Sequence, residues 1–309
     1  MKRYFREISV TAVLGLVLLG LAVFAPNFYQ PQPLLSLATR EAPVLVVACG
    51  MVFVIICRQI DISVGSIFSV CSVSAGLLAV RGWPLAAVVP AAAAMGAFLG
   101  ACNGVLVAAL GLPSIVVTLA TMVILRQGLN LVRQGEFVNM PDGMQWFGLS
   151  QSAGQWLLVG AALALLVALG LAARRLAAGR WVYAVGSDAE AARLAGIRPQ
   201  AVTFLVFVFM GVLGGLAAAM NIVQSPQVQP LAGAGMELKV IAAVVVGGVA
   251  ISGGRGNVWG AFAGLLLLAC VSPALTHLHI EAYWEKAIQG AIILLAVVAD
   301  GLRQRRVNR

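Results

Sequence analysis

Few residues of this chain have the types and spacing that catalysis requires. The two histidines, His277 and His279, form an H-x-H pair without a cysteine or a clear third ligand close by, so we predict no metal site. The sequence contains neither a G-x-S-x-G nucleophile motif nor an H-E-x-x-H zinc motif. It also lacks the G-x-x-x-x-G-K-[ST] loop that holds the phosphates of ATP. We therefore predict a non-catalytic chain that uses no cofactor and does not hydrolyse ATP itself.

The one long polar stretch, residues 174–200, lies between two strongly apolar runs and contains a candidate docking helix. Ser187 and Glu190 fit the S-x-x-E capping box, in which the two side chains satisfy each other's backbone donors. Gly196 stands where a left-handed C-cap residue is expected, and Pro199 prevents continuation. A helix of roughly nine residues is too short to be stable alone, so it needs support from the chain or from a partner.

Within this helix we expect two kinds of contact. The exposed polar contacts are predicted at Asp188, Glu190 and Arg193, and the surface that becomes buried at Ala191, Ala192 and Leu194.

The composition is that of an integral membrane protein. The 309 residues are 61% hydrophobic and 10% charged, far below the charge of about 25% in soluble domains. Long continuous apolar runs indicate membrane helices and not a barrel. The excess of 20 Lys+Arg over 11 Asp+Glu lies at the ends of these runs, which membrane topology explains without nucleic acid as a partner. We predict an all-α, multi-pass membrane protein that forms a single transmembrane unit over residues 1–309.

A transmembrane helix needs about 20 apolar residues. By this criterion we count about ten spans, roughly at 7–25, 42–57, 62–80, 85–110, 113–132, 154–172, 201–223, 238–252, 257–277 and 282–300. We interpret the first as an uncleaved span, with a cleaved signal peptide as the alternative. Basic residues at both termini and in the stretch 174–200 predict that all three lie in the cytoplasm. Residues 134–155 contain no Lys or Arg and are expected outside.

Glycines at four-residue intervals predict close contacts between helices. The ladders are formed by Gly96, Gly100 and Gly104, by Gly256, Gly260 and Gly264, and by Gly211 with Gly215. The first two share the pattern G-A-F-x-G in spans that run in opposite directions, which is compatible with an inverted repeat of spans two to five with seven to ten.

Polar residues inside the apolar runs form a candidate path for a solute. Asp61 is the only carboxylate in its region, and either an interfacial position beside Arg58 or a place on the path explains it. The remaining polar residues, which are uncharged, either bond to neighbouring helices or line a route for a hydroxylated solute. The path candidates are Asp61, Ser63, Ser66, Asn103, Thr118, Thr121, Asn221 and Gln224.

Taken together, these segments resemble the permease subunits of bacterial ATP-binding-cassette importers of the ribose, rhamnose and autoinducer-2 type. The similarity covers essentially the whole chain, in order, and the motifs that carry it are Ile60–Ser66, Asn103–Leu106, Leu112–Thr121, Gly179–Gly186, Gly233–Leu238, Ile241–Gly248 and Gly253–Gly256. The resemblance implies a cytoplasmic ATPase, a second permease subunit in a homodimer or heterodimer, and a periplasmic sugar-binding protein. It also implies that Ser187–Gly196 is the coupling helix that docks on the ATPase.

Three other functions remain open at this point. A branched-chain amino-acid permease shares the glycine-rich turn, and a secondary carrier would work without ATP. The small number of ionisable groups within the spans argues against the carrier, and a membrane enzyme lacks a plausible catalytic constellation.

Overall fold

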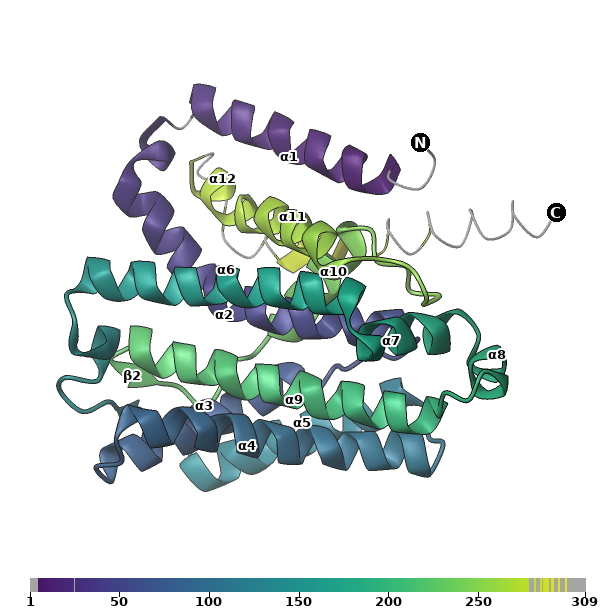
Figure 1. Ribbon diagram of the computed structural model, residues 1–309. Coiled ribbons are helices and arrows are strands. Elements are labelled where there is room, and N and C mark those ends of the chain that lie inside the picture. Colours follow the sequence, from purple (N-terminus) through teal and green to yellow (C-terminus); the bar gives the residue numbers. More distant parts are fainter. Residues whose placement is uncertain are drawn as a thin grey trace.

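The structure is a computed structural model that describes residues 5–24 and 26–277, with a few positions between residues 281 and 298. It is a helical bundle, as predicted (Figure 1). The helices are α1 (Phe5–Phe24), α2 (Pro31–Ile56), α3 (Val64–Val80), α4 (Leu85–Gly104), α5 (Ser114–Arg133), α6 (Gln151–Arg175), α7 (Ala177–Ser187), α8 (Ala189–Leu194), α9 (Pro199–Gln224), α10 (Met236–Val246), α11 (Val258–Ala269) and α12 (Val271–His277). Shorter pieces are the 3-10 turns η1 (Pro26–Tyr29) and η3 (Gln145–Gly148), the π-helical turn η2 (Val105–Ala109), and the strands β1 (Val138–Asn139) and β2 (Gln227–Val228).

Nine of the expected spans coincide with helices, but fewer of them are long enough to cross a membrane. Six helices in the described part meet the length and hydropathy required of a span. Helix α10 has 11 residues, which is about 16 Å of helix against a hydrocarbon core of about 30 Å. The tenth expected span, 282–300, and the basic C-terminus lie largely or wholly outside the described residues. The count of about ten and the cytoplasmic position of both termini stay predictions.

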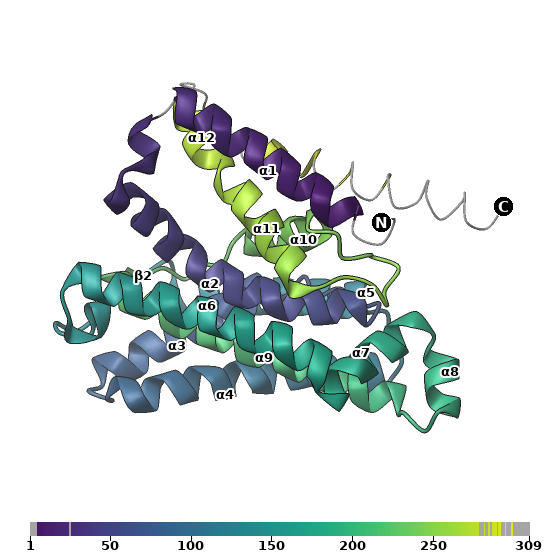
Figure 2. The ribbon, with the colours of Figure 1, turned by 45° about the horizontal axis from the view of Figure 1, so that its top comes forward.

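Helices α2 and α9 form the centre of the bundle. Helix α2 is apolar around its whole circumference and is buried from Ala42 to Ile56, as expected for a helix surrounded by others. Helix α9 packs on α2, α3 and α4, while α6 and α11 also contact α2. Helix α1 crosses α11 in an outer layer (Figure 2). Helix α5 contacts the bundle through only a narrow face and leaves most of its apolar surface exposed.

The first glycine ladder lies against α9. A β-carbon at Gly96 would overlap the carbonyl oxygen of Gly211, and one at Gly100 would overlap that of Phe207. Gly104 lies against the side chain and backbone of Phe204, and Gly211 and Gly215 form the matching surface of α9 for Gly96 and Gly100. Small residues thus let two backbones meet without intervening side chains, which is the packing that the spacing predicts.

The second ladder is only partly helical. Gly260 and Gly264 press against Gly247 and Ala243 of α10, again through backbone atoms. Gly256, however, lies in the turn before α11 with a φ of 137° and contacts Val249. Placing it in the helical ladder was wrong, because Asn257 caps α11 and the helix begins only at Val258.

The contacts between helices are compatible with the proposed inverted repeat. Helix α4 packs on α9, and its counterpart α11 packs on α2; α3 packs on α9, and its counterpart α10 packs on α2. An exchange of partners of this kind is what a two-fold relation within the membrane plane produces. The repeat itself stays a prediction.

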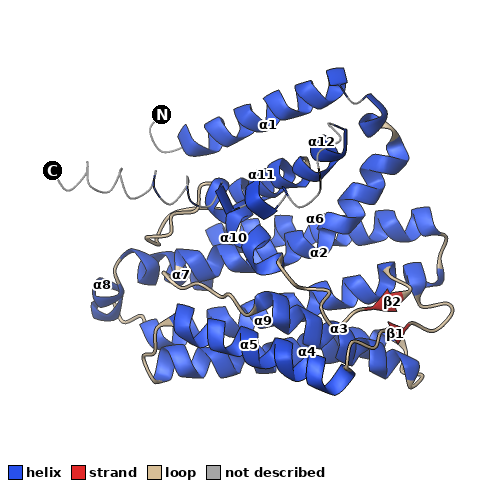
Figure 3. Cartoon of the chain, turned by 180° about the vertical axis from the view of Figure 1, so that it is seen from behind, coloured by secondary structure: helices blue, strands red, loops and turns tan. Residues whose placement is uncertain are grey.

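The two ends of the bundle differ in structure. At one end, called here the α8 end, α7 packs beside the ends of the long helices, α8 projects beyond them, and α1 begins there (Figures 1 and 2). At the opposite end, β1 and β2 form a short antiparallel pair, with Val138 opposite Val228 (Figure 3). Residues 134–150 therefore lie at the end opposite the polar stretch that contains α8, as the charge pattern predicted.

Candidate functional site

The first candidate site is α8, whose N-cap differs from the sequence prediction. Asp188 caps the helix, and its carboxylate accepts hydrogen bonds from the backbone N–H groups of Glu190 and Ala191, both at 2.9 Å. The prediction of a capping box at Ser187 was wrong, because Ser187 is still the last residue of α7. The backbone N–H of Asp188 accordingly donates to the carbonyl oxygen of Ala184. The side chain of Glu190 binds Arg193 instead, at 2.5 and 3.1 Å. Helix α8 consequently has six residues, fewer than expected.

The C-terminal end of α8 follows the prediction. Gly196 adopts a left-handed φ of 84°. The N–H of Ile197 donates to the carbonyl of Ala192 and that of Gly196 to Arg193, both at 3.0 Å, which is the paired pattern of a Schellman motif. Ala192 is buried and Ile197 half-buried, so this contact fastens α8 to the bundle.

The expected buried face of α8 is only partly buried within this chain. Ala191 is exposed, and 81% of Leu194 is accessible to solvent. The apolar side chain of Leu194 is therefore left uncovered by the described part of this chain. Asp188, Glu190 and Arg193 are exposed on the same short segment, as predicted.

Replacing Asp188 with alanine is expected to destabilise α8 by about 1 kcal/mol, since the cap to two backbone donors is lost. Ser187→Ala is the matched control and should have little effect, because the Ser187 side chain is exposed and makes no cap. Hydrogen exchange of the amides of residues 189–194 measures the difference. Equal effects of the two substitutions would contradict this assignment of the cap.

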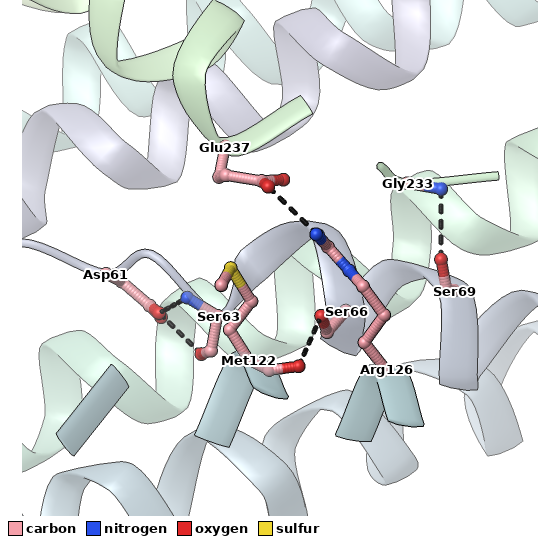
Figure 4. Close-up of polar contacts among 8 residues, drawn as sticks. All are labelled: Asp61, Ser63, Ser66, Ser69, Met122, Arg126, Gly233 and Glu237. Carbon is pink, nitrogen blue, oxygen red and sulfur yellow. Dashed lines mark hydrogen bonds and ion pairs between the residues drawn. The ribbon is translucent and has the colours of Figure 1, made fainter. Parts of the chain in front are cut away.

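The second candidate site is a chain of buried hydrogen bonds where α3 begins, called here the polar cluster: Asp61, Ser63, Asn103 and Thr121 (Figure 4 shows its Asp61 and Ser63). One carboxylate oxygen of Asp61 accepts from both the N–H and the hydroxyl of Ser63, at 2.9 and 2.6 Å. The amide of Asn103 donates to the Ser63 hydroxyl at 2.8 Å, and Thr121 donates to the Asn103 carbonyl oxygen at 2.7 Å. The cluster joins the α2–α3 segment to α4 and α5.

Asp61 lies inside the bundle and does not pair with Arg58. It is fully buried, because residues 57–63 turn back from the end of α2 into the bundle before α3 starts. Arg58, the expected interfacial neighbour, instead donates to the backbone of Ser187. The expected pairing of Asp61 with Arg58 is thus absent among the described contacts, and a place for Asp61 on the solute path stays a prediction.

The remaining path candidates divide into two groups. Ser66 donates to the Met122 carbonyl of α5 at 3.0 Å, and the Thr118 hydroxyl lies 3.3 Å from the carbonyl oxygen of Ile60, so both lie next to the polar cluster. Asn221 and Gln224 lie in the last turn of α9, near β2 at the other end, and are half-buried. The structure thus gathers six of the eight candidates around the start of α3.

The structure contains two ion pairs inside the bundle that the sequence did not predict. Arg126 of α5 binds Glu237 at the start of α10 at 2.9 Å, and Lys239 binds Glu41 of α2 at 2.8 Å. Figure 4 shows Arg126 and Glu237 meeting beside the first turns of α3. The signal was present in the sequence, since Arg126 interrupts an apolar run and a charge within a span requires a partner. The partners are 111 and 198 residues apart, which no local pattern reveals.

Comparison with known proteins agrees with this architecture. The family model for the permease component of branched-chain amino acid transport systems matches residues 34–297. The chain belongs to this permease family. It is 31% identical to the ribose import permease RbsC of Escherichia coli (strain K12) over 98% of both chains. It is 34% identical to the autoinducer 2 import permease LsrC of Klebsiella pneumoniae, over 97% of this chain and 88% of the relative.

A third relative, a probable ABC transporter permease of Sinorhizobium fredii, is 30% identical over 98% of the permease described here. No solved structure matches. With its apolar helices, the permease is a multi-pass protein of the inner membrane and a non-catalytic component of an ABC sugar importer.

Proposed function

We propose that this permease moves a monosaccharide or a sugar-like solute of the autoinducer-2, rhamnose or ribose class into the cytoplasm, driven by ATP hydrolysis on a separate subunit. Its partners are a cytoplasmic ABC ATPase, a second permease subunit and a periplasmic sugar-binding protein. The chain acts as one transmembrane unit, and α8 is the coupling helix that docks on the ATPase. The relatives named for ribose and autoinducer 2 support the solute class.

The exposed side chain of Leu194 is the observation that carries this proposal. It lies on a short capped helix that stands beyond the end of the bundle, among the exposed groups of Glu190 and Arg193. Exposed Arg174, Arg175 and Arg180 lie next to it in sequence, and such a concentration of arginine favours the cytoplasmic side. An apolar contact with a polar rim on that side suits a cytoplasmic protein partner.

The solute path is proposed to pass the start of α3. One carboxylate oxygen each of Asp61 and Glu237 is buried without a hydrogen-bond partner in the described part of the chain. A buried acceptor of this kind costs free energy unless a donor reaches it in some state of the protein. Hydroxyl groups of a sugar are such donors, and Ser63, Asn103 and Thr121 supply further polar atoms nearby.

Substituting Leu194 with aspartate is expected to abolish most ATP-dependent uptake, because the docking contact would bury a charge without a partner. Uptake is measured in proteoliposomes that contain the permease, the ATPase and the solute-loaded binding protein. Leu176→Asp is the matched control: Leu176 is also exposed, stands between α6 and α7 at the same end, and lies outside α8.

Normal uptake by Leu194→Asp would refute the docking role of α8. Uptake by the unsubstituted permease that requires neither ATP nor the binding protein would refute the importer proposal and indicate a secondary carrier.

A further inference from the structure

We infer that Arg58 is the positioning residue that transmits movement of α8 to the polar cluster. This inference rests on the proposed function, since it takes α8 as the element that receives the ATP-driven movement. It assigns a role to a residue at the end of α2 that is far from α8 in sequence but contacts the last residue of α7, just before α8.

The contact is between the Arg58 guanidinium and the backbone of α7. One guanidinium nitrogen donates to the carbonyl oxygen of Ser187 at 2.5 Å. Ser187 is the residue directly before Asp188, the N-cap of α8. A displacement of the start of α8 therefore reaches Arg58 through this hydrogen bond.

Arg58 also adopts an unusual backbone conformation. The φ of Arg58 is 61°. The N–H of Arg58 donates to the carbonyl oxygen of Ile55, and the N–H of Gln59 donates to that of Val54, both at 3.0 Å. This is a Schellman ending of α2 with arginine at the left-handed position, where glycine is the usual residue. A non-glycine residue in this left-handed conformation costs free energy. The hydrogen bond from the Arg58 side chain to Ser187 gives a reason for an arginine at this position.

A third segment completes the junction. The N–H of Gly254, in the turn between α10 and α11, donates to the carbonyl oxygen of Ile56 at 2.9 Å. Gly186 packs so closely on Ile56 that a β-carbon would overlap that carbonyl oxygen. The hydroxyl of Tyr183 in α7 donates to Gly256 in the same turn at 2.8 Å. The end of α7, the end of α2 and the α10–α11 turn thus meet mostly through backbone atoms, an arrangement that side-chain rotation cannot relax.

Two segments lead from the junction into the bundle, residues 59–63 and helix α10, and each carries buried polar side chains. From Arg58, the non-helical residues 59–63 run directly to Asp61 and Ser63, and Ile60 on the way donates to the Ser114 hydroxyl at 3.3 Å. From the turn, α10 leads back to Glu237 and Lys239, which hold α5 and α2. A rigid shift at one junction can therefore rearrange the polar groups on both sides of the start of α3.

Arg58→Gly tests this inference because it removes the guanidinium and relieves the backbone at the same time. The variant should fold and bind the ATPase, and with the binding protein it should still hydrolyse ATP. Solute uptake per ATP hydrolysed in proteoliposomes should fall at least about fivefold, the lower range of typical coupling between sites. Arg58→Lys keeps one cationic donor and should recover part of the loss. Arg174→Ala is the control, an exposed arginine at the α8 end, and should match the unsubstituted permease.

Uptake per ATP that is unchanged in Arg58→Gly would overturn the inference. So would a loss in Arg58→Gly that equals the loss in Arg174→Ala. Should Arg58→Gly yield no folded protein, Tyr183→Phe removes the hydroxyl that donates to Gly256, and unchanged uptake per ATP in that variant counts against the junction. Failure of the proposed function is distinguishable, since the unsubstituted permease would then not bind the ATPase at all.

Discussion

Glu237→Ala is expected to destabilise the folded permease by about 3 kcal/mol, because it leaves the Arg126 guanidinium without its carboxylate inside the bundle. Glu237 is buried, and the Arg126 side chain retains 25% exposure, which places the effect at the low end of the range for broken buried pairs. Unfolding free energies from denaturant titration in detergent micelles measure the loss. Replacing both residues by leucine should cost less than Glu237→Ala alone, since no charge is then left unpaired.

The matched control for this prediction is Glu136→Ala. Glu136 pairs with Arg133 at 3.6 Å and is 76% exposed, so its loss should cost less than about 1 kcal/mol. If the two single substitutions had equal effects, the pair between Arg126 and Glu237 would not be the internal tether between α5 and α10 that the structure shows.

Gly96→Ala is expected to destabilise the bundle by about 1–3 kcal/mol, the usual cost of overpacking a tight contact. The added β-carbon would overlap the backbone of Gly211, and a backbone atom cannot rotate away as a side chain can. Gly160→Ala in α6 is the control, because no atom lies within 4 Å of the position of its β-carbon. Thermal unfolding in the same detergent compares the two variants.

A control substitution as harmful as Gly96→Ala would show that the effect arises from glycine replacement in general. The packing of α4 on α9 through Gly96 and Gly211 would then lose its support.

The sequence predicted most helices well, because long apolar runs between polar turns leave the backbone in a membrane few alternatives. It also predicted the close approach at Gly96 and Gly100 and the left-handed Gly196, since glycine at those spacings has few other physical uses. The prediction was less successful for α10, whose apolar run is long enough to suggest a span although the helix has 11 residues.

The details of the candidate sites depended on contacts that sequence patterns do not contain. At the start of α8, both Ser187 and Asp188 are good capping residues, and the choice depends on α7 continuing through Ser187. The burial of Asp61 follows from the inward turn of residues 57–63, which looked like an ordinary end of a span. The ion pairs of Glu237 and Lys239 join helices far apart along the chain.

Site-specific crosslinking tests most directly whether α8 is in contact with the ATPase. Leu194→Cys in the assembled complex should crosslink to the ATPase through a short thiol reagent, above the background from the unsubstituted permease, whose Cys102 is exposed. Leu231→Cys, between β2 and α10, is the control and should not crosslink to it. A crosslink from position 231 and none from position 194 would contradict the account.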